Sequence, residues 1–289
     1  MIVMSDPWDD ALERAAEEPP EPRHPKRPVG RWAAVAAALI AAIAAGSIFF
    51  RGGPASPVEE SPATAVATAP AAAPSRPLGE EAPAIDLPPL GESDPIVRQM
   101  VRQLSTHPQV AAWLATDGLI RNFTVVVDNV AEGKTPARQL RALRPPAPFT
   151  VIEGPDGTRI DPRSYERYDA LADAAASIDP AGAARLYTML KPRLDEAYAE
   201  LGNADTTFDR ALEQAIVQLL ETPAPAGPLA LKPQGASAYR YVDPLIETLS
   251  DAQKQLLRMG PRNAAIVQQK LRAIAEALNI PADRLPPPE

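Results

Sequence analysis

Hydrophobic positions divide this chain into one continuous apolar run near its start and a later series of amphipathic segments. Residues 33–50 read AAVAAALIAAIAAGSIFF, with no charged side chain and with Ser47 as the polar exception. Extended by Trp32, such a run spans roughly 27–29 Å as a helix, which matches the hydrocarbon thickness of a bilayer. The pattern therefore predicts one transmembrane helix at residues 32–50.

The charges on either side of this run predict its orientation. Basic residues crowd the N-terminal side, whereas Arg51 stands alone on the other side until Arg76. By the positive-inside rule, the N-terminus lies in the cytoplasm. In a bacterial inner membrane, the C-terminal part of this single-pass protein is then periplasmic. The predicted interface residues before the helix are Arg23, Lys26, Arg27, Arg31 and Trp32.

Two further interpretations of the apolar run stay open. A cleaved signal peptide would use small residues such as Ala44 and Gly46, although the 31 residues before the run are many for a signal peptide. Small residues also recur every fourth position at Ala38, Ala42 and Gly46. This spacing lets two membrane helices approach closely, so a homodimer through the anchor is an alternative.

The segments around the anchor have compositions typical of disorder. Residues 1–31 mix acidic residues with prolines and have no apolar face to bury, which indicates a disordered cytoplasmic tail. Residues 51–89 are rich in proline and alanine, and such a linker extends by at most about 3.1 Å per residue. Residues 281–289 form a second proline-rich tail. The linker could therefore hold the next domain on the order of 100 Å from the membrane.

Residues 90–280 show the spacing of apolar residues that is typical of amphipathic helices. Capping residues and glycines mark the ends of most segments. Pro192 is expected to kink or split the helix that contains it. Helices are predicted at about 94–104, 109–115, 119–132, 162–177, 180–201, 207–221, 244–249, 251–259 and 262–278.

Three shorter segments are candidates for strands. The valines at 125–127 could form a strand, but apolar residues recur at helical spacing over residues 119–130, which favours a helix. Residues 149–153 and 158–160 flank the turn sequence GPDG and predict a β-hairpin. Residues 229–232 and 238–242 make a second small hairpin plausible. The predicted fold class is mainly α: a helical domain with one or two small β-hairpins, preceded by one transmembrane helix and a disordered Pro/Ala-rich linker.

Composition removes many kinds of chemistry. The chain has no cysteine and two histidines, His24 and His107, which excludes thiolate sites and leaves little for imidazole catalysis. It contains no Gly-rich phosphate loop, GxSxG, HExxH or EF-hand motif. His107 precedes Pro108 and is expected at the surface or as a helix cap. We therefore expect no catalytic residue, no cofactor and no metal site.

Carboxylates are the one plentiful group that could carry catalysis. Glu196 and Glu200 are four residues apart, Asp205 and Asp209 repeat the spacing, and Asp128 follows the valines. Paired carboxylates can hydrolyse glycans, so a carboxylate-dependent envelope hydrolase is the alternative function. It requires two of these side chains to meet in a deep pocket. Solvated faces are the simpler explanation, with Asp128 and Arg121 making polar contacts inside the domain.

One cluster of basic residues suggests a binding surface. Lys134, Arg138, Arg141 and Arg144 are spaced by four, three and three residues, so on a helix they would project from one side. A solvated face would explain them as well. As a functional surface they could meet an anionic lipid, a glycan or an acidic partner. Nucleic acid is not expected, because the chain's charge is −8 and no aromatic residues interleave the cluster.

Five stretches of the chain resemble a known bacterial family. They are LPPLGESDP at 87–95, LIRNFTVVVDNVAEGK at 119–134, YERYD at 165–169, AYAELG at 197–202 and LLRMGPRNAAIVQQKLR at 256–272. In this order they resemble the family called domain of unknown function 3014. The resemblance implies the same layout of anchor, spacer and domain, and it brings no activity, ligand or catalytic residue.

The sequence as a whole favours a non-enzymatic module of the cell envelope. A periplasmic helical domain on a long tether suits a binding or scaffold role, with an envelope protein, a cell-wall polymer or a second copy as partner. A ligand sensor is a further alternative. It would show an apolar pocket with the basic cluster at its mouth.

Overall fold

The computed structural model describes residues 77–80, 85–155, 157–203, 206–225, 227–234 and 238–287. The predicted transmembrane helix at 32–50, its basic flank, the acidic tail and most of the linker lie outside these residues. Within the described ranges, no single helix is long and apolar enough to cross a membrane. Helices α4 (Pro108–Leu114) and α5 (Leu119–Ala131) pass that test together, as a pair bent by 108°. Their apolar side chains belong to the core of the domain.

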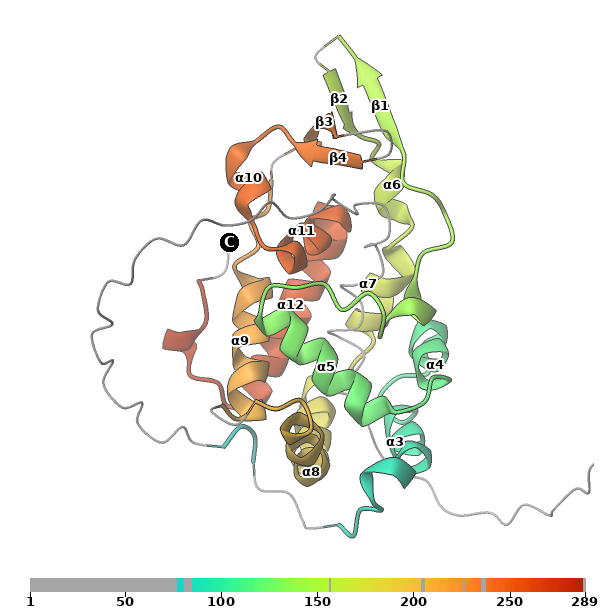
Figure 1. The fold of residues 1–289 in the computed structure, drawn as a ribbon, viewed down its shortest axis with the longest axis vertical. Helices are drawn as coiled ribbons and strands as arrows, with labels where there is room; N and C mark the ends of the chain where they lie inside the picture. Colours follow the sequence, from blue (N-terminus) through green and yellow to red (C-terminus); the bar gives the residue numbers. More distant parts are fainter. Residues whose placement is uncertain are drawn as a thin grey trace, which may run out of the picture. The chain divides into compact units, whose positions relative to one another are not determined.

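The domain is mainly helical, as predicted (Figure 1). Most predicted helices are present, with ends displaced by a few residues. Besides α4 and α5, the helices are α3 (Asp94–Val101), α6 (Arg163–Glu166), α7 (Asp169–Ala176), α8 (Pro180–Ala199), α9 (Phe208–Leu220), α10 (Pro244–Thr248), α11 (Asp251–Arg258) and α12 (Pro261–Ala277). Short 3-10 turns are η2 (Leu90–Glu92), η3 (Arg141–Leu143) and η4 (Ala282–Arg284).

Helix α5 occupies the centre of the helical body and packs against α8 and α9, while α12 packs against α7, α8 and α9 (Figure 1). The valines of α5 are helical, because the spacing of its apolar residues buries one wide face of the helix. An aromatic cluster joins three helices. The ring of Phe208 on α9 lies 5.8 Å from Phe123 on α5, and 6.2 and 5.4 Å from Tyr187 and Tyr198 on α8.

Both predicted hairpins form, and they combine into one sheet. Strands β1 (Val151–Gly154), β2 (Gly157–Ile160), β3 (Ala230–Gln234) and β4 (Ala238–Tyr241) are antiparallel in the order β1-β2-β3-β4. The hairpins join where Thr158 pairs with Leu231. The inner face of the sheet buries Ile160, Leu231 and Tyr241 in a second apolar cluster with Ile246 and Leu257.

Two helix predictions need correction. The single helix expected at 162–177 is two helices, α6 and α7, because the helical hydrogen bonding is interrupted at Tyr168. The buried hydroxyl of Tyr168 accepts a hydrogen bond from Gln255 on α11. Helix α8 runs unbroken through Pro192, so the expected split does not occur. Leu190 and Leu194 are both buried, which holds the helix against the core on either side of the proline.

Asp94 caps a helix other than its own. Its carboxylate accepts the backbone N–H groups of Gly118 at 2.7 Å and Leu119 at 2.9 Å, at the start of α5. Arg98, one turn after Asp94, donates to the carbonyls of Leu114 and Thr116, each at 2.7 Å. These two side chains of α3 therefore fix the turn between α4 and α5, which has no side-chain cap of its own.

Packing extends N-terminal to residue 90. Leu78 and Leu87 are buried in the main core, and the N–H of Gly79 donates to the carbonyl of Leu278 at 2.7 Å. Arg193 on α8 donates to the carbonyls of Leu87 and Pro88, each at 2.8 Å. The last part of the predicted linker is thus fastened to α8 and to the end of α12.

Gly260 is required by both its conformation and its surroundings. Its φ is +83°, and an added Cβ would lie 2.4 Å from the ring of Tyr165. We expect Gly260→Ala to lower the free energy of unfolding by roughly 2–6 kcal/mol in urea titrations, from backbone strain and overpacking together. Gly91→Ala is the control, because a Cβ there meets nothing within 4 Å. Equal stability of the two variants would contradict this account.

Asp94→Ala should lower the free energy of unfolding by about 2–3 kcal/mol, because it leaves two backbone donors at the start of α5 without their acceptor and removes one of the ion pairs of Arg98. Asp117→Ala is a matched control. Asp117 also pairs with Arg98, at 2.9 Å, but its side chain is 97% exposed. A change of less than about 0.5 kcal/mol is expected there. A loss as large for Asp117 would show that the ion pairs of Arg98 matter more than the cap.

Candidate functional site

The candidate carboxylates bind to separate partners. Glu200 accepts two hydrogen bonds from Arg121, at 2.6 and 2.9 Å, which lower the pKa of Glu200 and raise the pKa of Arg121. Asp128 accepts from Asn203 at 2.8 Å, and burial raises the pKa of its carboxyl. Arg121 and Asp128 thus both make polar contacts inside the domain, as expected, but with different residues.

The remaining carboxylates follow the same pattern. Glu196 pairs with Arg193 at 2.6 Å. Asp209 accepts from the hydroxyl of Tyr187 and lies 3.0 Å from Lys191 Nζ. Asp205 lies outside the described residues. The four described candidates are each held by a different basic or polar group, and within the described ranges no three His, Asp or Glu side chains form a metal-binding group.

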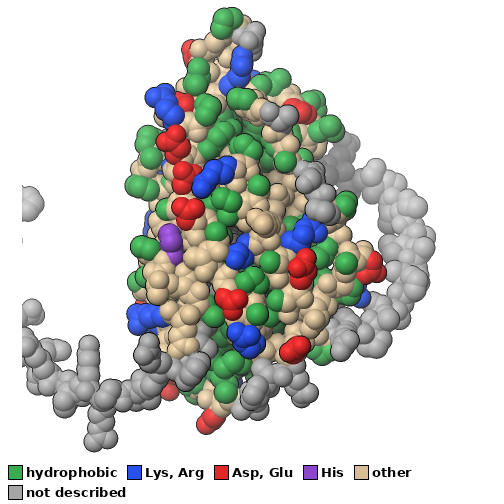
Figure 2. Space-filling model, turned by 180° about the vertical axis from the view of Figure 1, so that it is seen from behind, with side chains coloured by type: hydrophobic (Ala, Val, Ile, Leu, Met, Phe, Trp, Pro, Cys, Tyr) green, Lys and Arg blue, Asp and Glu red, His purple; other side chains and the backbone are tan. Residues whose placement is uncertain are grey.

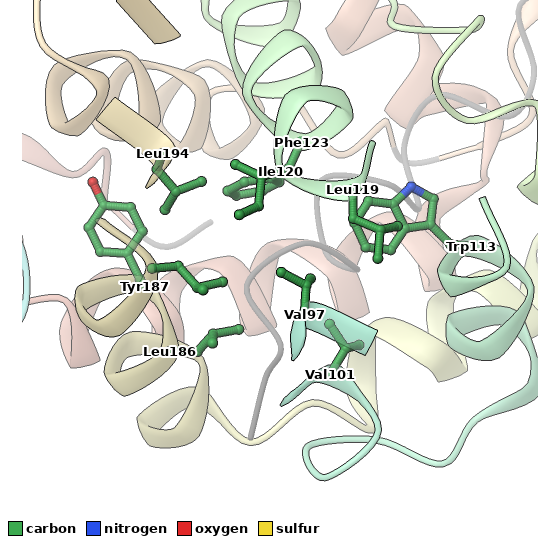
Figure 3. A pocket seen from close by; sticks show the side chains of 10 residues that line it. Val97, Val101, Trp113, Leu119, Ile120, Phe123, Leu186, Tyr187 and Leu194 are labelled. Atoms are coloured by element: carbon green, nitrogen blue, oxygen red, sulfur yellow. The ribbon is translucent and has the colours of Figure 1, made fainter. Parts of the chain in front are cut away.

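The domain contains a small apolar cavity between α3, α4, α5 and α8 (Figure 3). Its volume is about 20 Å³, and its lining includes Val97, Trp113, Phe123 and Leu194. Tyr187 lines one side, with its hydroxyl turned away from the other labelled residues in Figure 3 and bonded to Asp209. This volume is close to that of one water molecule, and the lining provides no polar partner for it. Neither the candidate carboxylates nor the basic cluster contributes to the lining, so the pattern expected of a ligand sensor is not seen here.

The basic cluster lies on an irregular segment that is fixed to the domain surface. We call residues 134–144 the basic segment. The segment is not an α-helix but consists of turns, irregular backbone and the short η3, so its basic residues do not form the single face that their spacing would give on a helix. Gly133 ends α5 with a φ of +71°, and Pro136 has no N–H to continue the hydrogen bonding.

Apolar and basic residues alternate along the basic segment. Pro136, Leu140 and Leu143 are buried. The basic residues between and around them, Lys134, Arg138, Arg141 and Arg144, are all exposed. Lys134 pairs with Glu132, which raises the pKa of the lysine. The three arginines form no ion pair within the described part of the chain, and residues 134–152 contain no Asp or Glu.

Arg167 is a further cation that the sequence did not single out. It donates to the carbonyl of Ala147 at 3.5 Å, just beyond the basic segment. Its guanidinium carbon lies 5.5 Å from the ring centre of Phe149 and 4.8 Å from that of Tyr168. The sequence YERYD could have indicated this contact, because it places an arginine beside tyrosines and guanidinium groups stack on aromatic rings.

His107 is a helix cap, as expected. Its Nδ1 accepts the N–H of Gln109 at 3.3 Å at the start of α4. The flanking residues Arg23, Lys26, Arg27, Arg31 and Trp32 and the small-residue row Ala38, Ala42 and Gly46 lie outside the described residues. On the face shown in Figure 2, basic and acidic side chains are interspersed rather than separated into fields of one sign.

Comparison with known proteins gives one match. A model of the family described as "Protein of unknown function (DUF3014)" matches residues 119–275, which include α5, the basic segment, the whole sheet and most of α12. No curated protein and no solved structure matches the chain. The matched region covers more than half of the sequence, so the chain belongs to the DUF3014 family.

Proposed function

We propose that this protein is a membrane-anchored, non-enzymatic binding module of the bacterial envelope. Residues 32–50 are the anchor, residues 1–31 the cytoplasmic tail, and the helical domain lies in the periplasm. The apolar run and the basic residues before it support this topology. The basic segment is the proposed binding surface for an acidic envelope protein or an anionic cell-wall polymer.

The exposed arginines of the basic segment carry this proposal. Their positions are set by the buried Pro136, Leu140 and Leu143, so the backbone that presents them is ordered before a partner arrives. Binding then loses less conformational entropy than it would from a flexible loop. Because the arginines have no ion pairs within the described residues, their guanidinium groups can bind carboxylates or phosphates in bidentate fashion without breaking existing bonds.

Burial of the leucines in the basic segment indicates that its partner is polar. Leu140 and Leu143 are buried and cannot contribute to an interface. Recognition through exposed cations alone depends on charge complementarity and weakens as salt increases. The linker before residue 77 extends to roughly 80 Å at about 3.1 Å per residue, so the domain could reach partners well away from the bilayer.

Fusions of alkaline phosphatase test the topology. An enzyme joined after residue 60 should be active in a Gram-negative host, because it would fold in the periplasm. The same fusion before residue 23 should be inactive. Activity at both sites or inactivity at residue 60 would contradict the orientation. The mass of the protein isolated from cells should include residues 1–31, and their loss would replace the anchor by a cleaved signal peptide.

Photocrosslinking in intact cells tests the binding surface. A photoreactive amino acid at Gln139, within the basic segment, should give a crosslink to an acidic protein or to cell-wall polymer. Reversing two charges with Arg138→Glu and Arg141→Glu should lower the yield about tenfold, because attraction becomes repulsion. The control is Arg102→Glu with Arg210→Glu, which changes net charge equally at two other exposed positions.

Each other outcome of this experiment contradicts the proposal. An equal loss in the control would mean that net charge, and not the basic segment, determines binding. An unchanged yield in both variants would show that the arginines are not used. A crosslink to nothing except a second copy of the chain would indicate self-association instead of an acidic partner.

A further inference from the structure

One face of the four-stranded sheet is largely exposed in the described part of the chain. Side chains alternate between the two faces of a strand, and those next to Ile160, Leu231 and Tyr241 point away from the core. On this outer face Ile152 is 48% exposed and Val242 is 49% exposed. They are two of the few large hydrophobic side chains that the described part of the protein exposes to this extent.

Strand register places four outer-face residues in one row. Ile152 on β1 pairs with Arg159 on β2, and Arg159 pairs with Ala230 on β3. Val242, directly after β4, donates its N–H to the carbonyl of Ala230 at 3.0 Å. With strands about 4.8 Å apart, the row is about 14 Å wide. It has an apolar residue at either end and a cation between them.

The next row of the outer face is cationic. Lys232 on β3 lies directly opposite Arg240 on β4, and both side chains are exposed. Like charges opposite each other destabilise a sheet, so this pair does not serve the stability of the fold. Glu247 on α10 bonds Arg240 at 3.2 Å and accepts the N–H of Tyr241 at 2.9 Å, which offsets part of the repulsion. No acidic residue of the four strands points outward in the described residues; Glu153 lies on the inner side.

Helix α10, which packs against β4, carries a third exposed apolar side chain. Leu245 is 78% exposed and follows β4 by four residues. We define the outer sheet face as Ile152, Arg159, Lys232, Arg240 and Val242, together with Leu245 on the adjoining α10. It combines exposed apolar side chains with cations, whereas the basic segment exposes cations and buries its leucines.

We propose that the outer sheet face docks on the surface of a bilayer that contains anionic phospholipid. Cations then meet the headgroups, while Ile152, Val242 and Leu245 enter the boundary between headgroups and acyl chains. A second copy fits less well, because a symmetric face-to-face dimer would bring the Lys232–Arg240 row against itself. The proposal rests on the membrane anchor of the proposed function, since residues 32–50 and the linker would keep a bilayer within reach of the domain.

The absence of cysteine allows a clean test on the full chain. We would introduce Leu245→Cys, attach an environment-sensitive fluorophore, and reconstitute the protein in vesicles of phosphatidylcholine with or without phosphatidylglycerol. Lipids carrying a nitroxide near the headgroup should quench this label when phosphatidylglycerol is present. A label at Leu201→Cys, two residues after the end of α8, should not be quenched, because α8 lies at the end of the helical body away from the sheet (Figure 1).

Neutral variants supply the second measurement. Lys232→Gln with Arg240→Gln should lower the equilibrium constant for docking roughly thirtyfold, because each cation near an anionic surface contributes about fivefold. Arg102→Gln with Arg210→Gln should leave quenching unchanged. Thermal unfolding checks that both variants fold. The proposal would be overturned if the label at position 245 were not quenched, or if the label at position 201 were quenched equally. It would also be overturned if quenching were unaffected by loss of Lys232 and Arg240, or if this face crosslinked to an acidic protein instead of lipid.

Extraction at alkaline pH separates this proposal from the anchor. A protein that resists extraction but shows no quenching at position 245 retains the anchor and contradicts docking. A protein that is quenched in phosphatidylglycerol vesicles but is released at alkaline pH docks without a transmembrane helix. The two ideas can therefore fail independently.

Discussion

The fold depends on burial of the aromatic ring of Phe208 against α5 and α8. Phe123, Tyr187 and Tyr198 surround this ring, so one side chain at the start of α9 connects that helix with α5 and α8. Tyr187 also lines the small cavity, and its hydroxyl is bonded to Asp209. The polar atoms of this cluster lie at its rim, so its centre excludes water. Groups that could bind a polar partner are therefore found at the surface of the domain.

Local patterns in the sequence predicted the parts of this fold that form through local interactions. The valines of α5 were assigned to a helix because their spacing buries one face, and the GPDG turn predicted the first hairpin. Joining the hairpins requires Thr158 to meet Leu231, more than 70 residues later, and no periodicity reports such a contact. Asp94 shows the same limit. It lies in the first turn of α3, but its carboxylate accepts backbone N–H groups at the start of α5, 24 and 25 residues later.

The candidate surfaces differ in how far the sequence could predict them. The arginines of the basic segment were identified from spacing alone, but the helical face that this spacing would give does not form, because Gly133 and Pro136 interrupt the hydrogen bonding. The outer sheet face could not be predicted at all. It exists because register places Ile152, Arg159, Ala230 and Val242 in one row, and a shift by one residue would send each of these side chains to the core.

A tether changes how strong such a surface must be. Under the proposed anchoring, the domain never leaves the bilayer by more than its linker allows, and short flexible connections give effective concentrations in the millimolar range. An interaction too weak to measure between separate molecules is then populated for much of the time. Three exposed apolar side chains and a few cations are enough in this regime, and a larger apolar patch would favour aggregation. The modest size of the outer sheet face is therefore what a tethered domain needs for reversible contact with its own membrane.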